Sequence, residues 1–184
     1  MRVTSRLLPV LVAFIAASAA ASAQNISSLT QLLTTPGGEK VSIAKLGAGK
    51  VTVVSFWATW CKPCKEEMKA MQPLIEKMKG EGRQVEYIAV SIDNTKTMAK
   101  VGPFITSKNY TFPVLLDPNS EMFLGLNGTQ VPYTLIFRAD GSLAKKHDGY
   151  LEGDEAKMEA ELLELLASTG GAGGANAAAP TPAE

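Results

Sequence analysis

The chain has two cysteines, Cys61 and Cys64, and they lie three positions apart in the stretch W-A-T-W-C-K-P-C-K-E-E-M. The segment before them, 51–57, is mostly β-branched or aromatic, which predicts a strand that is buried on both faces. After them, apolar residues recur at steps of four and three, as on one face of a helix: Cys64, Met68, Met71, Ile75 and Met78. Both thiols are therefore expected where a buried strand gives way to a helix.

The rest of the chain also alternates between strand-like and helix-like segments. Further segments have the patterns of strands (41–44, 85–92, 114–116, 133–137 and 143–147) or of helices (95–108, 120–126 and 154–167). Pro73 is expected to kink or break the first long helix, and Gly102-Pro103 to interrupt the next one. The order predicts an α/β fold with a central mixed sheet flanked by helices. An inserted helix and extended segment would separate its βαβ and ββα halves.

The two ends of the chain differ in composition from this middle part. Residues 1–23 combine Arg2 and Arg6 with an apolar run and an A-S-A site before Gln24, which predicts a cleaved secretory signal peptide. A retained membrane anchor is the alternative. Residues 24–38 are expected to be a flexible lead-in, 39–168 the folded domain, and 169–184 a disordered tail without large apolar residues. Export to the periplasm would place the thiols in an oxidising compartment.

Three chemistries are open to a lone C-x-x-C pair. A disulfide that closes so short a loop removes little entropy from the unfolded chain, about 2 kcal/mol. A purely structural role for the pair is therefore disfavoured. Zinc prefers four ligands, and the chain offers two cysteines and a distant single histidine, His147. A two-thiolate Cu(I) site remains possible, because soft ligands suit that ion. A redox couple is favoured by the strand–helix context.

The helix start supplies the physical reason for redox reactivity. Free N–H groups and the helix dipole stabilise a thiolate at the position of Cys61, and Lys62 adds a positive charge. Pro63 fits the first turn, where a missing N–H costs nothing. Cys64 lies one turn further, on the apolar stripe. The pattern therefore predicts an exposed attacking thiol at Cys61 and a shielded resolving thiol at Cys64.

Several stretches resemble one family. S-F-W-A-T-W-C-K-P-C-K-E-E, V-S-I-D-N at 90–94 and T-Q-V-P-Y-T at 129–134 are similar to segments of the thioredoxin superfamily. The similarity covers about residues 39–168 and is closest to its exported branch, the TlpA-like and ResA-like thiol–disulfide oxidoreductases. The resemblance implies a thioredoxin-like fold and the reduction of disulfides in extracytoplasmic proteins, for example the thiols of apocytochromes. A dithiol that is kept reduced outside the cytoplasm needs a supplier of electrons, for which a membrane thiol carrier is expected. A monomer without a cofactor is also expected.

The resemblance also assigns roles to particular residues. It implies that Pro132 follows a cis peptide bond, and that Val131 presents backbone groups to a bound substrate strand. Glu67 matches a glutamate that handles protons beside the thiols, although a solvated surface glutamate is the alternative. Trp60 is expected to cover the sulfurs and contact substrate. Ser55 stands where thioredoxin has a buried aspartate, which makes Glu67 or water the remaining route for protons.

Charge and motif content limit the other functions. The chain carries 18 basic and 18 acidic residues without long charged runs, which argues against a nucleic-acid partner. A peroxide-consuming enzyme on the same scaffold would need one peroxidatic cysteine in a loop with threonine and proline. The stretch T-W-C-K-P-C at 59–64 lacks that arrangement. The sequence leaves the reduction potential, the substrate and the electron donor open.

Overall fold

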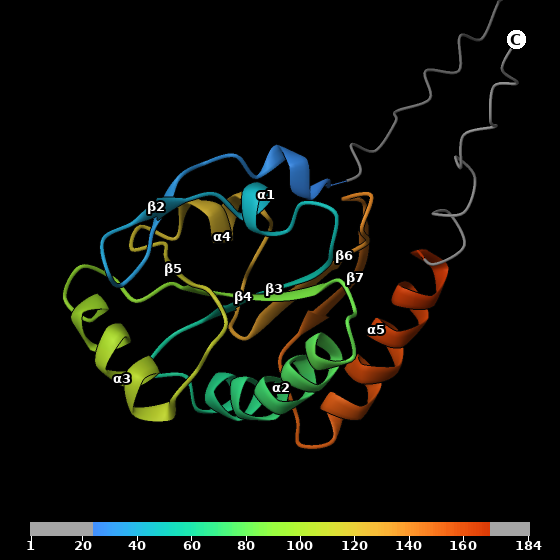
Figure 1. Cartoon of the computed structure of the whole chain (residues 1–184). Coiled ribbons are helices and arrows are strands. Elements are labelled where there is room, and N and C mark those ends of the chain that lie inside the picture. The colour runs from blue at the N-terminus through green and yellow to red at the C-terminus, as the bar shows by residue number, and fades with distance from the viewer. Residues whose placement is uncertain (1–23, 170–184) are drawn as a thin grey trace, which may run out of the picture.

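The computed structural model describes residues 24–169, and it contains one seven-stranded mixed sheet flanked by helices (Figure 1). The strands lie in the order β2-β1-β5-β4-β3-β6-β7. Their bounds are β1 (Leu33–Thr34), β2 (Lys40–Val41), β3 (Val51–Trp57), β4 (Val85–Ser91), β5 (Val114–Leu116), β6 (Tyr133–Phe137) and β7 (Leu143–Asp148). The helices are α1 (Ile43–Leu46), α2 (Lys62–Gly80), α3 (Val101–Lys108), α4 (Glu121–Gly125) and α5 (Asp154–Thr169), with 3-10 turns at Ile26–Ser28 and Met98–Lys100. This confirms the predicted α/β architecture.

The central strand β3 organises both layers of the core. It runs parallel to β4 and antiparallel to β6, and all seven of its residues are buried. Because successive side chains of a strand point to opposite faces, Val53 and Trp57 pack toward α2 and α5, whereas Val54 and Phe56 pack toward α1 and α4. Helices therefore cover both faces of the sheet (Figure 1).

Helix α2 begins directly after Cys61 and buries the apolar stripe that the sequence predicts, from Cys64 to Met78. The prediction that Pro73 breaks it is wrong, since the helix continues through this residue to Gly80. Pro73 has no N–H to donate to the carbonyl of Lys69, four residues earlier in the helix. Both residues are exposed. Water can then solvate that carbonyl, which makes the proline tolerable.

Two local predictions are corrected by hydrogen bonding at helix starts. The strand expected at 41–44 ends at Val41, because the Ser42 hydroxyl accepts the N–H of Lys45 at 3.3 Å and caps α1. The helix expected at 95–108 begins only at Val101. Gly102-Pro103 therefore lies in its first turn, where proline is well accommodated, and does not interrupt it.

The segment 24–38, expected to be a flexible lead-in, is part of the fold. Strand β1 pairs with both β2 and β5, and the side chains of Ile26 and Leu33 are 4% and 5% exposed. These two apolar residues anchor a segment that otherwise has little to bury. The predicted signal peptide (1–23) and the predicted tail, except Thr169 at the end of α5, lie outside the described residues. Within residues 24–169, no helix has the length and apolar character needed to cross a membrane.

Replacing Leu33 with alanine is expected to lower the free energy of unfolding by about 2 kcal/mol, because a buried side chain is truncated. Urea unfolding followed by circular dichroism measures this. The neighbouring Leu32 is 61% exposed and provides the control, since Leu32→Ala should change stability by less than about 0.5 kcal/mol. Equal effects of the two substitutions would contradict a structural role for β1.

Candidate active site

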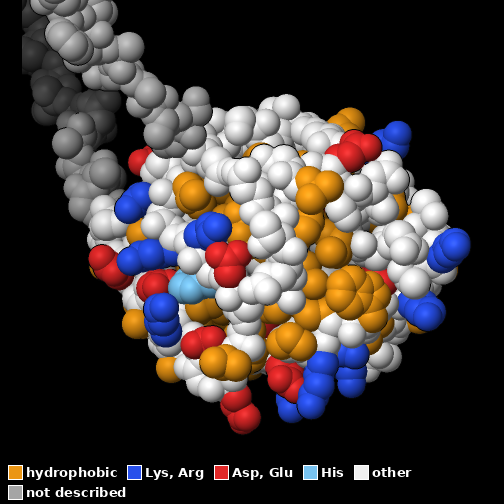
Figure 2. Space-filling view, turned by 180° about the vertical axis from the view of Figure 1, so that it is seen from behind, with side chains coloured by type: hydrophobic (Ala, Val, Ile, Leu, Met, Phe, Trp, Pro, Cys, Tyr) orange, Lys and Arg blue, Asp and Glu red, His pale blue; other side chains and the backbone are white. Residues whose placement is uncertain are grey.

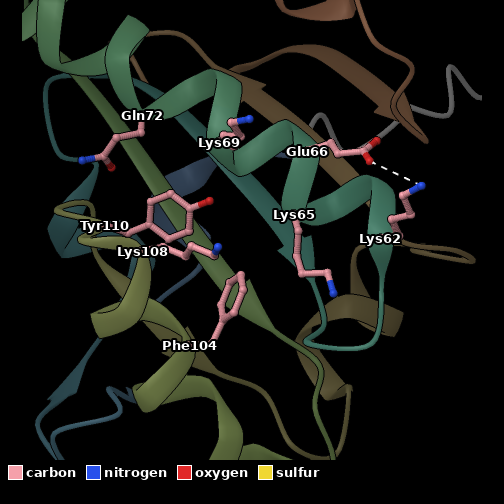
Figure 3. Close-up of a pocket in the computed structure, with 8 residues that line it drawn as sticks. All are labelled: Lys62, Lys65, Glu66, Lys69, Gln72, Phe104, Lys108 and Tyr110. Carbon is pink, nitrogen blue, oxygen red and sulfur yellow. Dashed lines mark ion pairs between the residues drawn. The ribbon is translucent and has the colours of Figure 1, made fainter.

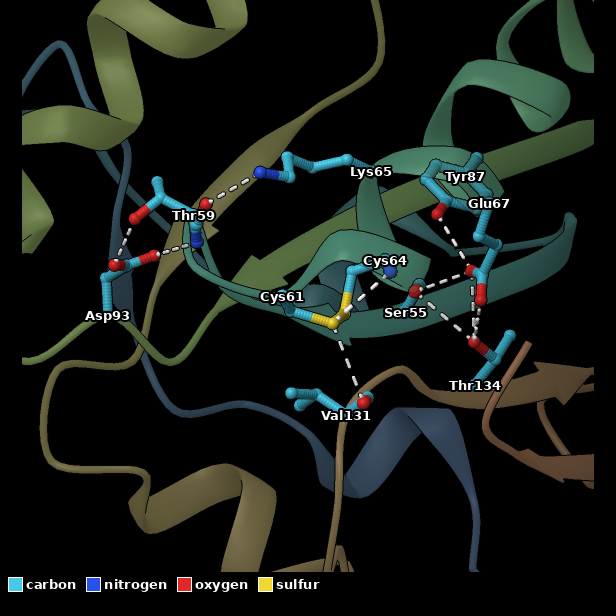
Figure 4. Close-up of a disulfide and its surroundings, with 10 residues drawn as sticks. All are labelled: Ser55, Thr59, Cys61, Cys64, Lys65, Glu67, Tyr87, Asp93, Val131 and Thr134. Carbon is cyan, nitrogen blue, oxygen red and sulfur yellow. Dashed lines mark hydrogen bonds between the residues drawn. A yellow bond between two sulfur atoms is a disulfide. The ribbon is translucent and has the colours of Figure 1, made fainter. Parts of the chain in front are cut away.

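Cys61 and Cys64 form a disulfide with an S–S distance of 2.01 Å at the start of α2 (Figure 4). Cys61 is the N-cap residue, and its Sγ accepts the N–H of Cys64 at 3.2 Å. Cys64 is fully buried, as expected for a shielded thiol, but Cys61 is only 5% exposed. The expectation of an exposed Cys61 is therefore wrong in degree, because the loop before the neighbouring strand β6 covers this sulfur.

That covering loop precedes β6 and contains Val131 and Pro132. The carbonyl oxygen of Val131 lies 3.6 Å from the Sγ of Cys61, and the Val131–Pro132 peptide bond is cis, the configuration that the resemblance implies. Pro132 is buried and Val131 is partly exposed. Antiparallel pairing of β6 with β3 brings this loop to the cysteines across 70 residues of sequence.

The surroundings of the disulfide offer apolar surface to a bound chain. Trp60, which directly precedes Cys61, is 63% exposed. A groove of about 580 Å³ lies beside the cis-proline loop, and its lining includes Pro63, Val131, Pro132, His147, Tyr150 and Leu151. Figure 2 shows hydrophobic side chains gathered on the face that carries the pale blue histidine. Val131, Pro132 and Trp60 thus lie where a substrate could contact them, and their roles stay predictions.

Asp93 fixes the loop that carries Cys61, a role that the sequence reasoning missed. Its carboxylate accepts the N–H of Thr59 at 2.7 Å, the hydroxyl of Thr59 at 2.6 Å and the hydroxyl of Ser91 at 2.9 Å (Figure 4). Burial alone would raise the pKa of Asp93, but the hydrogen bonds from Thr59, Thr97 and Ser91 together outweigh it and lower the pKa. The Thr59 carbonyl in turn accepts a hydrogen bond from Lys65 at 3.2 Å.

The order of the strands indicates that Asp93 lies near the cysteine loop. Strands β3 and β4 are parallel, and Trp57 pairs with Ser91 at their carboxyl ends. A carboxylate two residues beyond the end of β4 therefore faces the loop that follows β3, which is the loop of the cysteines. The motif V-S-I-D-N at 90–94 resembles a family segment, but the resemblance assigns no role to its aspartate.

Glu67 lies on α2 one turn after Cys64, and its carboxyl group is buried among hydroxyl groups from three strands. Its Oε1 accepts hydrogen bonds from Ser55 at 2.7 Å, Tyr87 at 3.1 Å and Thr134 at 3.1 Å (Figure 4). The side chain is 1% exposed, so the alternative of a solvated surface glutamate is wrong. Burial raises the pKa of Glu67, although the three hydrogen bonds oppose the rise.

This hydroxyl cluster can satisfy either protonation state of Glu67. The ionised carboxylate accepts from all three hydroxyls. When protonated, Glu67 can donate through Oε2 to Thr134 at 3.3 Å, while Thr134 donates to Ser55 at 3.2 Å and Ser55 donates back to Oε1. Tyr87 remains a donor in both cases, because burial and the charge of Glu67 raise its pKa. A proton can therefore enter or leave Glu67 without leaving a hydroxyl unpaired.

A further titratable group near this cluster, His147, has a structural partner. His147, which pairs across the strands with Thr134, has its Nε2 2.7 Å from a carboxylate oxygen of Glu161 and so links β7 to α5. Within residues 24–169, no three histidine, cysteine or acidic side chains gather in a way that could hold a metal ion. The site thus brings the two sulfurs together with the buried carboxyl groups of Glu67 and Asp93.

Known proteins resemble this chain to different extents. The chain is 39% identical over 103 residues to the thiol-disulfide oxidoreductase ResA of Oceanobacillus iheyensis, a match that covers 56% of this chain and 52% of the relative. It is 32% identical over 131 residues to the thioredoxin-like protein YneN of Bacillus subtilis, covering 71% and 74%. The solution structure of an uncharacterised thioredoxin-like protein from Porphyromonas gingivalis has 34% identity and a TM-score of 0.67, covering 79% and 95%.

The family itself follows from a model that spans most of the domain. The AhpC/TSA family model matches residues 22–146, from before β1 into β7. The chain spans about half the length of the ResA relative, whereas it covers most of the P. gingivalis structure. These similarities confirm the resemblance to thioredoxin-like proteins, and the chain belongs to the AhpC/TSA family.

Proposed function

We propose that the protein is an exported thiol–disulfide oxidoreductase that reduces disulfides in extracytoplasmic proteins. The observation that carries this proposal is the Cys61–Cys64 disulfide at a helix N-terminus, with one sulfur against the cis-proline loop. The names of the ResA relatives support the reaction class. A purely structural brace would not need one sulfur against a loop that borders a groove.

The reaction starts from the reduced protein. The Cys61 thiolate, stabilised by the N–H of Cys64 and the helix dipole, attacks one sulfur of the substrate disulfide. A bond forms between Cys61 and that sulfur, the substrate bond breaks, and the second substrate sulfur leaves as a thiolate that takes up a proton. Cys64 then attacks Cys61, which restores the protein disulfide and releases the first substrate thiol. Two electrons pass from the protein to the substrate.

Glu67 is proposed to manage the proton of Cys64. As a carboxylate it can accept the thiol proton, directly or through water, and so generate the attacking thiolate in the second step. Its hydroxyl cluster tolerates both charge states, which suits repeated proton transfer. Val131 is proposed to hold the substrate backbone beside Cys61, with Trp60 and Pro132 as apolar contacts.

The setting of the reaction is also part of the proposal. The predicted signal peptide places the protein in the periplasm, where a membrane thiol carrier would return two electrons to the oxidised pair in each cycle. Apocytochrome thiols are a fitting product of such a reductase. The protein is proposed to act as a monomer.

The test is reduction of insulin by dithiothreitol in the presence of the protein. The precipitation of insulin chains, followed as turbidity, should begin several times sooner than with dithiothreitol alone. Equilibration of the pair in thiol buffers gives its potential, and a reductase should have a value nearer to the about −270 mV of thioredoxin than to the about −120 mV of a strong oxidant. A pair that exchanges no faster than free dithiothreitol would contradict the proposal.

A further inference from the structure

A second pocket lies between α2 and α3, with a lining that begins at Lys62, the residue after Cys61, and the proposed reaction does not use it. Its volume is about 630 Å³. Figure 3 shows its lining, which consists of four lysines, one glutamate, one glutamine and two aromatic residues: Lys62, Lys65, Lys69, Lys108, Glu66, Gln72, Phe104 and Tyr110. The chain as a whole has equal numbers of acidic and basic residues, so this is a local concentration of positive charge.

Few of these positive charges are neutralised within the protein. Lys62 forms an exposed ion pair with Glu66 at 3.9 Å, and the ammonium group of Lys65 donates to the neutral carbonyl of Thr59. In the part of the chain that the structure describes, Lys69 and Lys108 have no acidic partner. Four cations and one carboxylate therefore leave the pocket positive. Lys69 also borders a neighbouring pocket that Glu66, Glu152 and Glu155 line, but it forms no ion pair with them in the described residues.

The aromatic residues give the pocket a fixed apolar wall. The ring centroid of Phe104 lies 5.4 Å from that of Trp57 and 6.1 Å from that of Tyr110, which in turn stacks on Phe112 at 4.9 Å. In Figure 3, Lys65 from α2 and Lys108 from α3 extend toward the space beside Phe104 and Tyr110. An apolar wall next to cations excludes water and strengthens their attraction for a negative charge.

The position of the pocket relates it to the disulfide. Lys62, Lys65, Lys69 and Gln72 follow one another at steps of three, four and three, so they share one face of α2 that starts one residue after Cys61. At 1.5 Å per residue this face is about 15 Å long, which equals about four to five residues of an extended chain. A polypeptide whose cysteine reacts at Cys61 can thus lay its next few residues along the pocket.

We propose that this lysine pocket binds an acidic segment that flanks the reactive cysteine of the protein substrate. The inference rests on the proposed function and adds a determinant of substrate choice. Aspartate or glutamate side chains within about five residues of the substrate cysteine would pair with Lys69 and Lys108, and apolar or aromatic neighbours would contact Phe104 and Tyr110. Lys65 is bound to the active-site loop through Thr59 and is a less suitable position for a test.

The experiment compares two synthetic peptides that contain the same intramolecular disulfide and differ only in three flanking residues, glutamates in one and glutamines in the other. Their reduction by the pre-reduced full chain is followed by the change in tryptophan fluorescence, and second-order rates are measured at low salt. The glutamate peptide should react about fivefold faster, which corresponds to two partly exposed ion pairs. Salt at about 0.5 M should remove the difference.

The double variant Lys69→Gln/Lys108→Gln should lower the rate for the glutamate peptide to that for the glutamine peptide. The matched control is Lys40→Gln/Lys45→Gln, which removes the same charge from exposed positions on β2 and α1, elements on the other side of the sheet (Figure 1). It should keep the fivefold preference. Equal rates for the two peptides with the unaltered protein, or an equal loss in the control variant, would overturn this inference alone. Failure to reduce either peptide would contradict the proposed function and this inference with it.

Discussion

Replacing Cys61 with serine is expected to abolish disulfide reduction by the protein, so that insulin precipitates no sooner than with dithiothreitol alone. A serine hydroxyl remains protonated near neutrality and cannot form the mixed disulfide, so the first step of the proposed cycle has no nucleophile. The substitution is nearly isosteric, and the N-cap position of α2 accepts serine well, so the fold should persist. Retained activity in Cys61→Ser would refute the assignment of the attacking thiol.

Cys64→Ser is the matched control because it removes the same disulfide. Both variants should lose the same modest stabilisation of about 2 kcal/mol, which excludes stability as the source of any difference between them. Cys64→Ser still attacks but cannot resolve, so it should accumulate a covalent adduct with the substrate. Mass spectrometry without reductant should detect this adduct in Cys64→Ser and not in Cys61→Ser. Adducts in both variants or in neither would argue against the assigned order of attack.

The parts of the fold that could be predicted from sequence are those with long or repeated patterns. The buried run of β3 and the stripe of α2 placed both cysteines at a strand–helix junction, as the structure has them. Strand β1 could not be found in this way, because two residues show no period, and its burial depends on pairing with β5, about 80 residues away. The course of α2 through Pro73 depends on which face is solvated, which the proline itself does not reveal.

In the active site, too, the sequence predicts individual residues but not the contacts between distant segments. Resemblance selected Glu67, but its burial arises from Ser55 on β3, Tyr87 on β4 and Thr134 on β6, which only the sheet order brings together. From the sequence, Ser55 is only the residue that replaces the buried aspartate of thioredoxin. In the structure its hydroxyl donates a hydrogen bond to Glu67. A contact between three strands and a helix has no signature in any one of them.

Glu67→Gln is expected to slow the reduction cycle by about a hundredfold at neutral pH, within the usual range for loss of a general base. Glutamine preserves the shape of the side chain and can accept hydrogen bonds from Ser55 and Thr134, but it cannot take up or release a proton. Because burial raises the pKa of Glu67, the unaltered protein should show a rate that rises with pH through this raised pKa. The variant should lack that rise. Glu66→Gln, which changes an exposed neighbour, should retain it.

The same substitution should also change how stability depends on pH, which tests the buried carboxyl group independently of activity. Since the pKa of Glu67 is higher in the folded than in the unfolded chain, the folded protein binds more protons between the two values. The free energy of unfolding should therefore fall as pH rises from the ordinary glutamate value of 4.5 to the raised one, and then level off. Urea unfolding of the oxidised protein at several pH values should show this decline in the unaltered chain and in Glu66→Gln. A decline of the same size in Glu67→Gln would mean that another group titrates, and the proton-handling role of Glu67 would then lose its physical basis.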